Sequence, residues 1–345
     1  MGVKNNTNGT RFSSKSIIKT VYVYIILLLV VVVLSLIKGE PFQRGNFLYP
    51  DAVMNLLMMS VPILLISSGF TFIMISGNID LSVGSTLSLT TVFYSILALN
   101  GVPFFPALLI TIALGVVLGG INGWLVAKMR ITPVIATLIT MSVYQGIARY
   151  LVPEGISAIK SGDGLEMPAW IGDFSRTGLE LRLSSDFVLK LSWALMLAIL
   201  IIVILYILQR KTVLGKYVAA IGGNRTAAEL SGINVVKVVW GVYVMLGALS
   251  ALAGVARGSY LTIGEPYTGI GTETQAIIAV LLGGTVFTGG EGSVIKSVIG
   301  ALIIICLTLG LKNILPAYWQ SLATGVVLVL AVALNHVLSK ESIAA

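Results

Sequence analysis

The chain has 345 residues, of which 57% are apolar and only 10% are charged, and its formal net charge is +8. Soluble domains carry about 25% charged residues, so this composition excludes a water-soluble globular protein. Long uncharged runs suit lipid, where helices satisfy their own backbone hydrogen bonds. The run Tyr24–Ile37 lacks the alternation of an outer-membrane barrel strand, and we therefore expect an all-α integral membrane protein.

The first predicted element follows a basic, polar tail of residues 1–19. The apolar run 20–37 is long enough to span a bilayer and no small-residue cleavage site precedes Glu40, so we expect an uncleaved helix. Further apolar segments follow, most of them about 18–23 residues long, as a helix needs to cross ~30 Å of hydrocarbon. They are 53–75, 81–99, 105–127, 132–152, 187–208, 238–256, 275–289, 293–311 and 317–338.

Basic residues set the predicted orientation. With a cytoplasmic N-terminus, 13 of the 22 Lys and Arg residues fall inside, with a dense cluster at Gln209–Lys216. Both termini are then cytoplasmic, loop 153–186 is periplasmic and loop 209–237 is cytoplasmic, within one transmembrane domain of residues 20–340. We interpret the excess positive charge as the determinant of membrane orientation and as a source of contacts with lipid headgroups. We expect no nucleic-acid partner.

About ten segments divide into two five-segment halves, and a second five-span unit must be inverted relative to the first. Segments 3 and 8 are short or interrupted. Segment 3 follows the polar stretch Ser76–Ser85, and Gly283–Gly284 breaks segment 8. Interruptions at matching positions of two inverted halves indicate a substrate path.

Helix capping explains some of the same residues. Asp80 and Ser82 are typical caps of a helix that starts at the inner surface. Thr272 and Gln275 fit a capping box. For Glu273, a pore mouth and a solvated loop fit equally well. Capping and a place on a substrate path remain compatible for these residues.

Close helix packing is predicted for the fourth segment. Gly115, Gly119 and Gly123 repeat every four residues, so they form one face on which a second backbone can approach closely.

The residues needed for several kinds of chemistry are missing. The sequence contains no P-loop, and its only histidine is His336, which excludes a His-rich zinc peptidase site. Ionisable residues are nearly absent from the span centres, which argues against an ion-coupled carrier. We therefore expect no catalytic site, metal or cofactor in this chain, and any ATP hydrolysis to occur on another subunit.

The cytoplasmic loop contains a short helix with its own caps. Asn224 is a typical N-cap, the run RTAAEL favours a helix, and Ser231–Gly232 is a C-cap signal. Arg225 and Glu229 are spaced to pair on one face. We interpret this helix as a docking element for a partner protein.

Three motifs carry a resemblance to a known family. GKYVAAIGGNRTAAELSGI, SGNIDLSVGS and TQAIIAVLLGGTVFTGGEGSVIKSVIGALI resemble segments of bacterial ABC sugar-import permeases of the ribose, xylose and galactofuranose type, in the branched-chain amino acid/ribose permease superfamily. The matches are in family order and cover roughly residues 50–340. One departure is Gly77–Asn78, where the family commonly has GGIDLSVG.

The resemblance implies a permease subunit of an ATP-driven importer in the bacterial cytoplasmic (inner) membrane. Its substrate would be a monosaccharide, a pentose or hexose, furanoses included. The implied partners are a second permease subunit, a cytoplasmic ATPase with tandem nucleotide-binding domains that holds ATP and Mg, and a periplasmic or lipid-anchored sugar-binding protein.

The resemblance also implies site residues. ATPase docking falls on Gly223, Asn224, Arg225, Thr226, Ala227, Ala228, Glu229, Leu230, Ser231 and Gly232. The translocation path falls beside Asn78, Asp80 and Ser82. Apart from the resemblance, the interruption of segment 8 makes Glu273 and Gln275 candidates for the same path. A nucleoside, a branched-chain amino acid and an autoinducer-type furanone are alternative substrates. An ion-coupled secondary carrier and an intramembrane enzyme are alternative classes.

Overall fold

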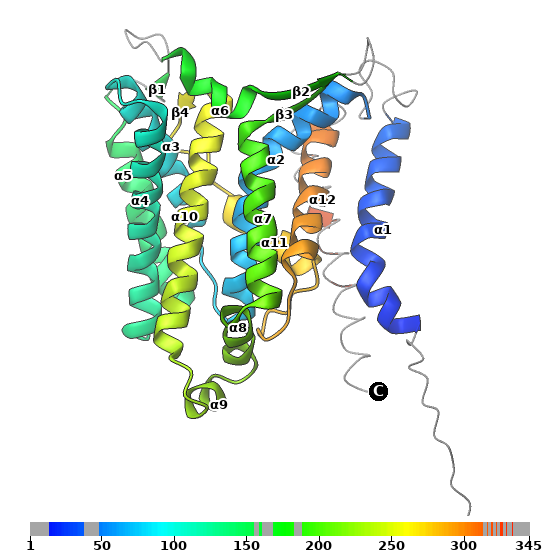
Figure 1. Cartoon of the computed structure of the whole chain (residues 1–345), viewed down its shortest axis with the longest axis vertical. Coiled ribbons are helices and arrows are strands. Elements are labelled where there is room, and N and C mark those ends of the chain that lie inside the picture. Colours follow the sequence, from blue (N-terminus) through cyan, green and yellow to red (C-terminus); the bar gives the residue numbers. More distant parts are fainter. Residues whose placement is uncertain are drawn as a thin grey trace, which may run out of the picture.

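A computed structural model describes residues 14–37, 48–154, 159–160, 168–182 and 188–312, with isolated positions between 316 and 333. Helices dominate, and most run side by side (Figure 1). They are α1 Ser14–Ile37, α2 Pro50–Ile75, α3 Val83–Leu99, α4 Phe104–Gly123, α5 Pro133–Tyr150, α6 Asp173–Arg176, α7 Trp193–Lys211, α8 Val213–Gly223, α9 Arg225–Leu230, α10 Val235–Leu261, α11 Thr272–Leu282 and α12 Val294–Lys312. A π-helical turn, Trp124–Lys128, extends α4, and a 3₁₀ turn, Ala169–Gly172, precedes α6.

Five helices in the described part of the chain are long and apolar enough to cross a membrane: α2, the extended α4, α7, α10 and α12. The apolar stretch Val21–Ile37 of α1 and the helices α3 and α11 are shorter than the 18 residues needed to span a membrane. The prediction that segments 3 and 8 are short is therefore confirmed. The predicted segment 317–338 lies almost wholly outside the described residues, so the count of ten spans and the inverted halves stay predictions.

Helices α2 and α10 form the centre of the bundle. Helix α10 packs against α2, α3 and α4, and most of α2 is buried. The predicted close approach on α4 is confirmed: a β-carbon on Gly247 of α10 would lie 2.7 Å from the Gly119 Cα. Glycine is required on both helices because any side chain would separate their backbones.

The two interrupted segments meet inside this bundle. Residues 76–82 connect the end of α2 to the start of α3. Residues 265–271 connect the segment that follows α10 to the start of α11. The Gly269 amide donates a hydrogen bond to the Ser88 hydroxyl at 2.9 Å. Gly84 lies so close to Gly269 that a β-carbon there would overlap the Gly269 carbonyl oxygen.

Short strands gather at one end of the bundle, here called the hairpin end (Figure 1). The strands are β1 Ile159–Lys160, β2 Gly178–Arg182, β3 Val188–Ser192 and β4 Ile263–Gly264. Strands β1 and β4 pair antiparallel, and β2 and β3 form an antiparallel hairpin with Gly178 opposite Ser192. Helices α8 and α9 lie at the opposite end, here called the α9 end.

Two predicted boundaries are wrong. The span predicted to start at residue 187 starts as a helix only at Trp193, because 188–192 pair with β2; the Ser192 hydroxyl then caps α7 by accepting from the Leu195 amide at 3.2 Å. In the predicted loop 209–237, residues 213–223 form helix α8 instead. Its glycines favour a loop locally, but packing of Val218 and Ile221 into the core stabilises a helix.

Candidate functional site

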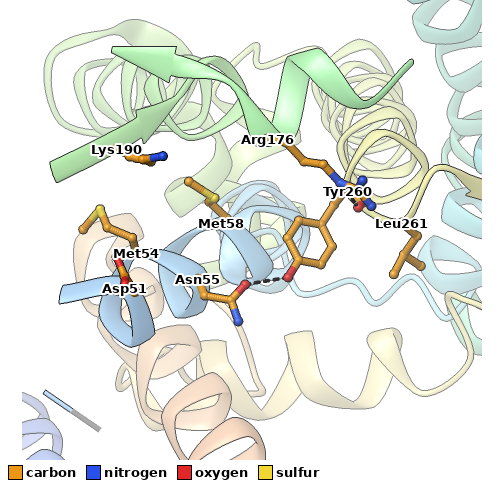
Figure 2. Close-up of a pocket in the computed structure, with 8 residues that line it drawn as sticks. All are labelled: Asp51, Met54, Asn55, Met58, Arg176, Lys190, Tyr260 and Leu261. Atoms are coloured by element: carbon orange, nitrogen blue, oxygen red, sulfur yellow. Dashed lines mark hydrogen bonds between the residues drawn. The ribbon is translucent and has the colours of Figure 1, made fainter. Parts of the chain in front are cut away.

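A cavity of about 450 Å³ opens at the hairpin end between α2, α6, β3 and α10 (Figure 2). We call it the hairpin-end cavity. Its lining residues are Asp51, Met54, Asn55, Met58, Arg176, Lys190, Tyr260 and Leu261.

Polar contacts hold the wall of this cavity. The Tyr260 hydroxyl donates to the Asn55 side-chain oxygen at 2.5 Å, and Figure 2 shows the two side chains facing each other. The Arg176 Nε donates to the Tyr260 carbonyl oxygen at 2.8 Å, and Lys190 forms an ion pair with Glu180 at 3.2 Å. An aromatic ring, an amide and charged groups around methionines suit a small polar molecule that also has apolar faces.

A second cavity, of about 220 Å³, lies between α2, α3, α10, α11 and α12. We call it the central cavity. Its polar lining residues are Arg257, Thr268, Thr272, Gln275 and Thr308, and its apolar lining residues are Met59, Pro62, Ile63, Leu87, Ile270, Ile305 and Leu309. Arg257 Nε donates to the Thr268 hydroxyl at 3.2 Å, and the carboxylate of Glu265 interacts electrostatically with the guanidinium.

The two cavities follow one another along the same pair of helices. On α2, Met58 lines the hairpin-end cavity, whereas Met59 and Pro62 line the central cavity. On α10, Tyr260 lines the hairpin-end cavity and Arg257 lines the central cavity. The residues named are one to four positions apart, which corresponds to about 1.5–6 Å along a helix axis. The cavities are therefore neighbours, one about a turn deeper than the other.

The predicted capping box at the start of α11 is wrong. Gly271, with φ of +84°, occupies the N-cap position and has no capping side chain. The Gly271 amide donates instead to the Glu273 Oε1 at 3.1 Å. Neither Thr272 nor Gln275 caps the helix, and both line the central cavity.

Glu273 does not line either cavity, and its Oε2 is buried against Gly84 without a hydrogen-bond partner among the described residues. Glu273 therefore lies where the two interrupted segments cross. A solvated loop, one of the two predicted alternatives for Glu273, is therefore wrong, and the pore mouth stays a prediction.

Asp80 and Ser82 belong to a buried hydrogen-bond network. Asp80 Oδ1 accepts from the Ser82 amide at 2.8 Å and from the Ser82 hydroxyl at 2.7 Å. Asn122 of α4 donates to the Ser82 hydroxyl at 2.6 Å, and the Tyr243 hydroxyl of α10 donates to the Ile79 carbonyl at 2.8 Å. Asp80 and Ser82 are 2% and 1% exposed, so they fix the loop 76–82 in place and line none of the cavities described.

Asn78, from the same loop, lines a third cavity of about 330 Å³ at the α9 end. The cavity also involves the turn between α4 and α5 and three residues of α9. The remaining lining residues are Val126, Arg130, Ile131, Thr132, Pro133, Arg225, Thr226 and Glu229.

Helix α9 has the predicted bounds and caps. Asn224 Oδ1 accepts from the Ala227 amide at 3.0 Å, and Gly232 has a φ of +83°. Arg225 and Glu229 form the predicted pair at 3.5 Å. Within the helix only Ala228 is buried, so its other side chains are available to a partner protein.

Five residues from three distant segments join α8 to both interrupted segments. We call them the glycine junction: Ile75, Gly77, Gly222, Gly289 and Gly290. The Gly290 amide donates to the Ile75 carbonyl at 2.8 Å, and a β-carbon on Gly222 would lie 2.5 Å from the Gly290 nitrogen. The backbones touch, because only glycine leaves room for them.

A fourth cavity, of about 360 Å³, lies beside this junction. It is lined by Arg210, Gly283, Gly284, Gly290, Glu291, Gly292, Ser293 and Lys296. Nearby, Gln209 of α7 donates to the Gly292 carbonyl at 2.9 Å and accepts from the Val294 amide at 2.9 Å. The C-terminal glycine-rich segment is thus tied to the end of α7.

Sequence reasoning missed Arg257, Asn55 and Tyr260. Arg257 is an isolated charge at the end of an apolar run, and that charge in a membrane helix was the signal available. Among the described residues no group of three or more His, Cys, Asp or Glu side chains is placed to hold a metal ion.

Comparison with known proteins identifies relatives over most of the chain. The family described as branched-chain amino acid transport system / permease component matches residues 52–332. The ribose import permease protein RbsC of Haemophilus influenzae is 32% identical, over 93% of this chain and 94% of that protein. RbsC of Bacillus subtilis is 34% identical, over 84% and 86%. The xylose transport system permease protein XylH of Haemophilus influenzae is 33% identical, over 93% and 97%. No solved structure gives a significant match.

Proposed function

Because this chain belongs to the family of branched-chain amino acid transport system permease components, we propose that it is the membrane permease subunit of an ATP-driven ABC importer for a monosaccharide. Relatives named as permeases for ribose, xylose, D-allose and fructose support a sugar as the substrate. The chain itself changes no covalent bond, and the hydrolysis of ATP takes place on a separate ATPase subunit.

The glycine junction is the observation that carries this proposal. It connects Gly222 of α8, two residues before the cap of the exposed helix α9, to the backbones of both interrupted segments. A permease must convert movement of a docked ATPase into movement around a substrate path. Backbone-to-backbone contact transmits such movement well, because it has no flexible side chain in between.

We assign the α9 end to the cytoplasm and the hairpin end to the periplasm, in the bacterial inner membrane. Basic residues in the last turns at the α9 end, Lys128, Arg210 and Lys211, support this orientation. Helix α9 and its flanking residues, Gly223 to Gly232, dock on an ATPase with tandem nucleotide-binding domains that binds ATP and Mg. A periplasmic or lipid-anchored sugar-binding protein delivers the sugar at the hairpin end, and a second permease subunit completes the membrane pore.

The test is a single substitution in the docking helix. In Ala227→Pro the ring removes the amide that donates to Asn224, so the cap is lost and α9 is disrupted. Ala227→Ser keeps that amide and is the control. With the partner ATPase and binding protein present, we expect Ala227→Pro to insert normally and to lose ATP-driven uptake. Normal uptake by a well-inserted Ala227→Pro variant would refute the docking role.

An ion-coupled secondary carrier is the second candidate. One observation favours it: Asp80 is buried in the bundle and Arg257 and Glu273 are partly buried, which is more ionisable groups than the near-absence expected from the sequence. Such residues often couple transport to ions. Uptake by the chain alone, in vesicles that contain an ion gradient and no ATP, would decide for this carrier and against the ABC importer.

A further inference from the structure

We propose that the central cavity is an intramembrane binding site for a neutral polyhydroxylated molecule, with Arg257, Thr272 and Gln275 as its hydrogen-bonding contacts. This inference rests on the proposed function and names the point on the route at which the sugar contacts this chain. Neither the family motifs nor the relatives' names assign a role to Arg257 or Thr272, and Gln275 was until now only a candidate for the translocation path.

Unused hydrogen-bonding capacity marks the cavity as a binding site. A guanidinium has five N–H donors, and among the described residues Arg257 uses only its Nε, to Thr268. The Gln275 amide and the Thr272 hydroxyl line the same space and form no side-chain hydrogen bond with the described residues. Polar groups left unpaired at membrane depth are costly, so a ligand that pairs with them is stabilised here.

The mixture of donors and acceptors fits hydroxyl groups. Arginine only donates, whereas the glutamine amide and the threonine hydroxyl both donate and accept. A sugar hydroxyl does the same and can bridge them. On α2 and α3, Met59, Pro62 and Leu87 provide an apolar surface for the C–H face of a sugar ring. A site with a few polar groups on an apolar wall is typical for small ligands.

The charge and the volume of the central cavity limit the kinds of ligand that it can bind. The carboxylate of Glu265 interacts electrostatically with the guanidinium of Arg257, which reduces the attraction of the cavity for an anion. Its volume of about 220 Å³ is below the roughly 300 Å³ at which pockets for drug-sized ligands begin. One neutral ring with its hydroxyls matches both properties.

We infer that the ligand reaches the central cavity from the hairpin-end cavity, which lies next to it on α2 and α10. Pro62 lies inside α2 and has no amide hydrogen to donate to the Met58 carbonyl one turn earlier. That carbonyl belongs to the turn that separates the two cavities, where it provides an acceptor for a passing hydroxyl. On the other side of this turn, the hydrogen-bonded side chains of Asn55 and Tyr260 line the hairpin-end cavity.

Cysteine accessibility tests the inference. The chain has a single cysteine, Cys306, which is buried, so Cys306→Ala gives a cysteine-free background. In this background we place Thr272→Cys and Gln275→Cys in the central cavity and Thr274→Cys as the control. Thr274 is exposed on the same helix and does not line the cavity. Whole cells are treated with a small, charged methanethiosulfonate reagent, with or without D-ribose, D-xylose, D-allose, D-fructose or L-leucine.

We expect an imported sugar to slow modification at positions 272 and 275 and to leave position 274 unchanged. At a sugar concentration ten times its Kd, the rate should fall about tenfold. The Thr308→Cys variant, on α12, reports on the same cavity if the α11 variants fail to insert. L-leucine should not protect any of these positions.

The outcomes separate the two proposals. If the wild-type system imports none of the four sugars, the proposed function fails and this inference fails with it. If the wild-type system imports a sugar, but the cavity cysteines do not react or react at a rate that this sugar does not change, the site is wrong while the proposed function stands. Protection by L-leucine alone would overturn a polyhydroxylated ligand.

Discussion

Gly222 is the residue at which a single methyl group should separate transport from membrane insertion. An ideal β-carbon there lies 2.5 Å from the Gly290 nitrogen, 2.9 Å from the Ile75 carbonyl carbon and closer still to the Ile75 oxygen. Carbon contacts are optimal at about 3.5–4.0 Å. The Gly222→Ala substitution therefore forces three backbones apart by roughly an ångström, and the atoms in contact cannot rotate away.

The expected cost follows from this overlap. Overpacking of a rigid site destabilises by about 1–3 kcal/mol, and occasionally by more. Such a loss is tolerable for a bundle that buries most of α2 and α10. We therefore expect the Gly222→Ala protein to insert and fold, with a lower unfolding temperature in detergent. The backbones of the glycine junction no longer pack against one another, so we expect movement of α9 not to be transmitted to the interrupted segments.

The assay is ATP-driven sugar uptake into vesicles, measured together with ATP hydrolysis by the attached ATPase. We expect hydrolysis to persist in the Gly222→Ala variant and uptake to fall at least tenfold. Gly146→Ala is the control, because a β-carbon at this helical position of α5 meets no heavy atom within 4 Å outside its own helix. It should be neutral or slightly stabilising, as alanine favours a helix over glycine. Wild-type uptake by Gly222→Ala, or an equal loss in both variants, would refute the role of the junction.

Two further predictions concern stability. Gly247→Ala places a methyl group against Gly119 of α4, whereas Gly241→Ala on the same helix meets open space; we expect a loss of about 1–3 kcal/mol for the first and no loss for the second, measured by thermal unfolding in detergent. Asn122→Leu removes the amide that donates to the Ser82 hydroxyl and to Asp80 Oδ2. It should cost about 1–3 kcal/mol, because the buried Asp80 Oδ2 then has no hydrogen-bond partner among the described residues. Equal unfolding temperatures for Asn122→Leu and the wild type would show that this network does not stabilise the loop 76–82.

Local signals in the sequence predicted local structure well. The caps of α9 at Asn224 and Gly232 depend on residues within one turn, and the structure has them as predicted. The small-residue face of α4 was also predictable, because the repeat of Gly115, Gly119 and Gly123 lies on one helix. Its partner Gly247 was not, since nothing in one helix specifies which other helix packs on it.

Features that depend on contacts between distant segments were missed. Helix α8 was predicted as loop because its glycines disfavour a helix, and only burial in the tertiary structure overrides this preference. Residues 188–192 were assigned to a helix because their apolar content continues into α7, although pairing with β2 makes them a strand. The central cavity combines residues from α2, α3, α10, α11 and α12, so no single motif marks it.

Both interrupted segments contain glycine and polar residues, but they differ in how their polar groups are satisfied. In the loop 76–82, Asp80 and Ser82 bond to each other and to Asn122, which leaves a fixed structural element. Around the start of α11, Gln275 lines a cavity, and Arg257 has donors that no described residue accepts. Satisfied polar groups in a membrane hold a backbone in place, whereas unsatisfied groups beside a cavity are available to a ligand. This difference supports our proposal that Gln275 lies on the substrate route and Asp80 in its scaffold, although in the sequence alone both residues were compatible with capping and with a place on the path.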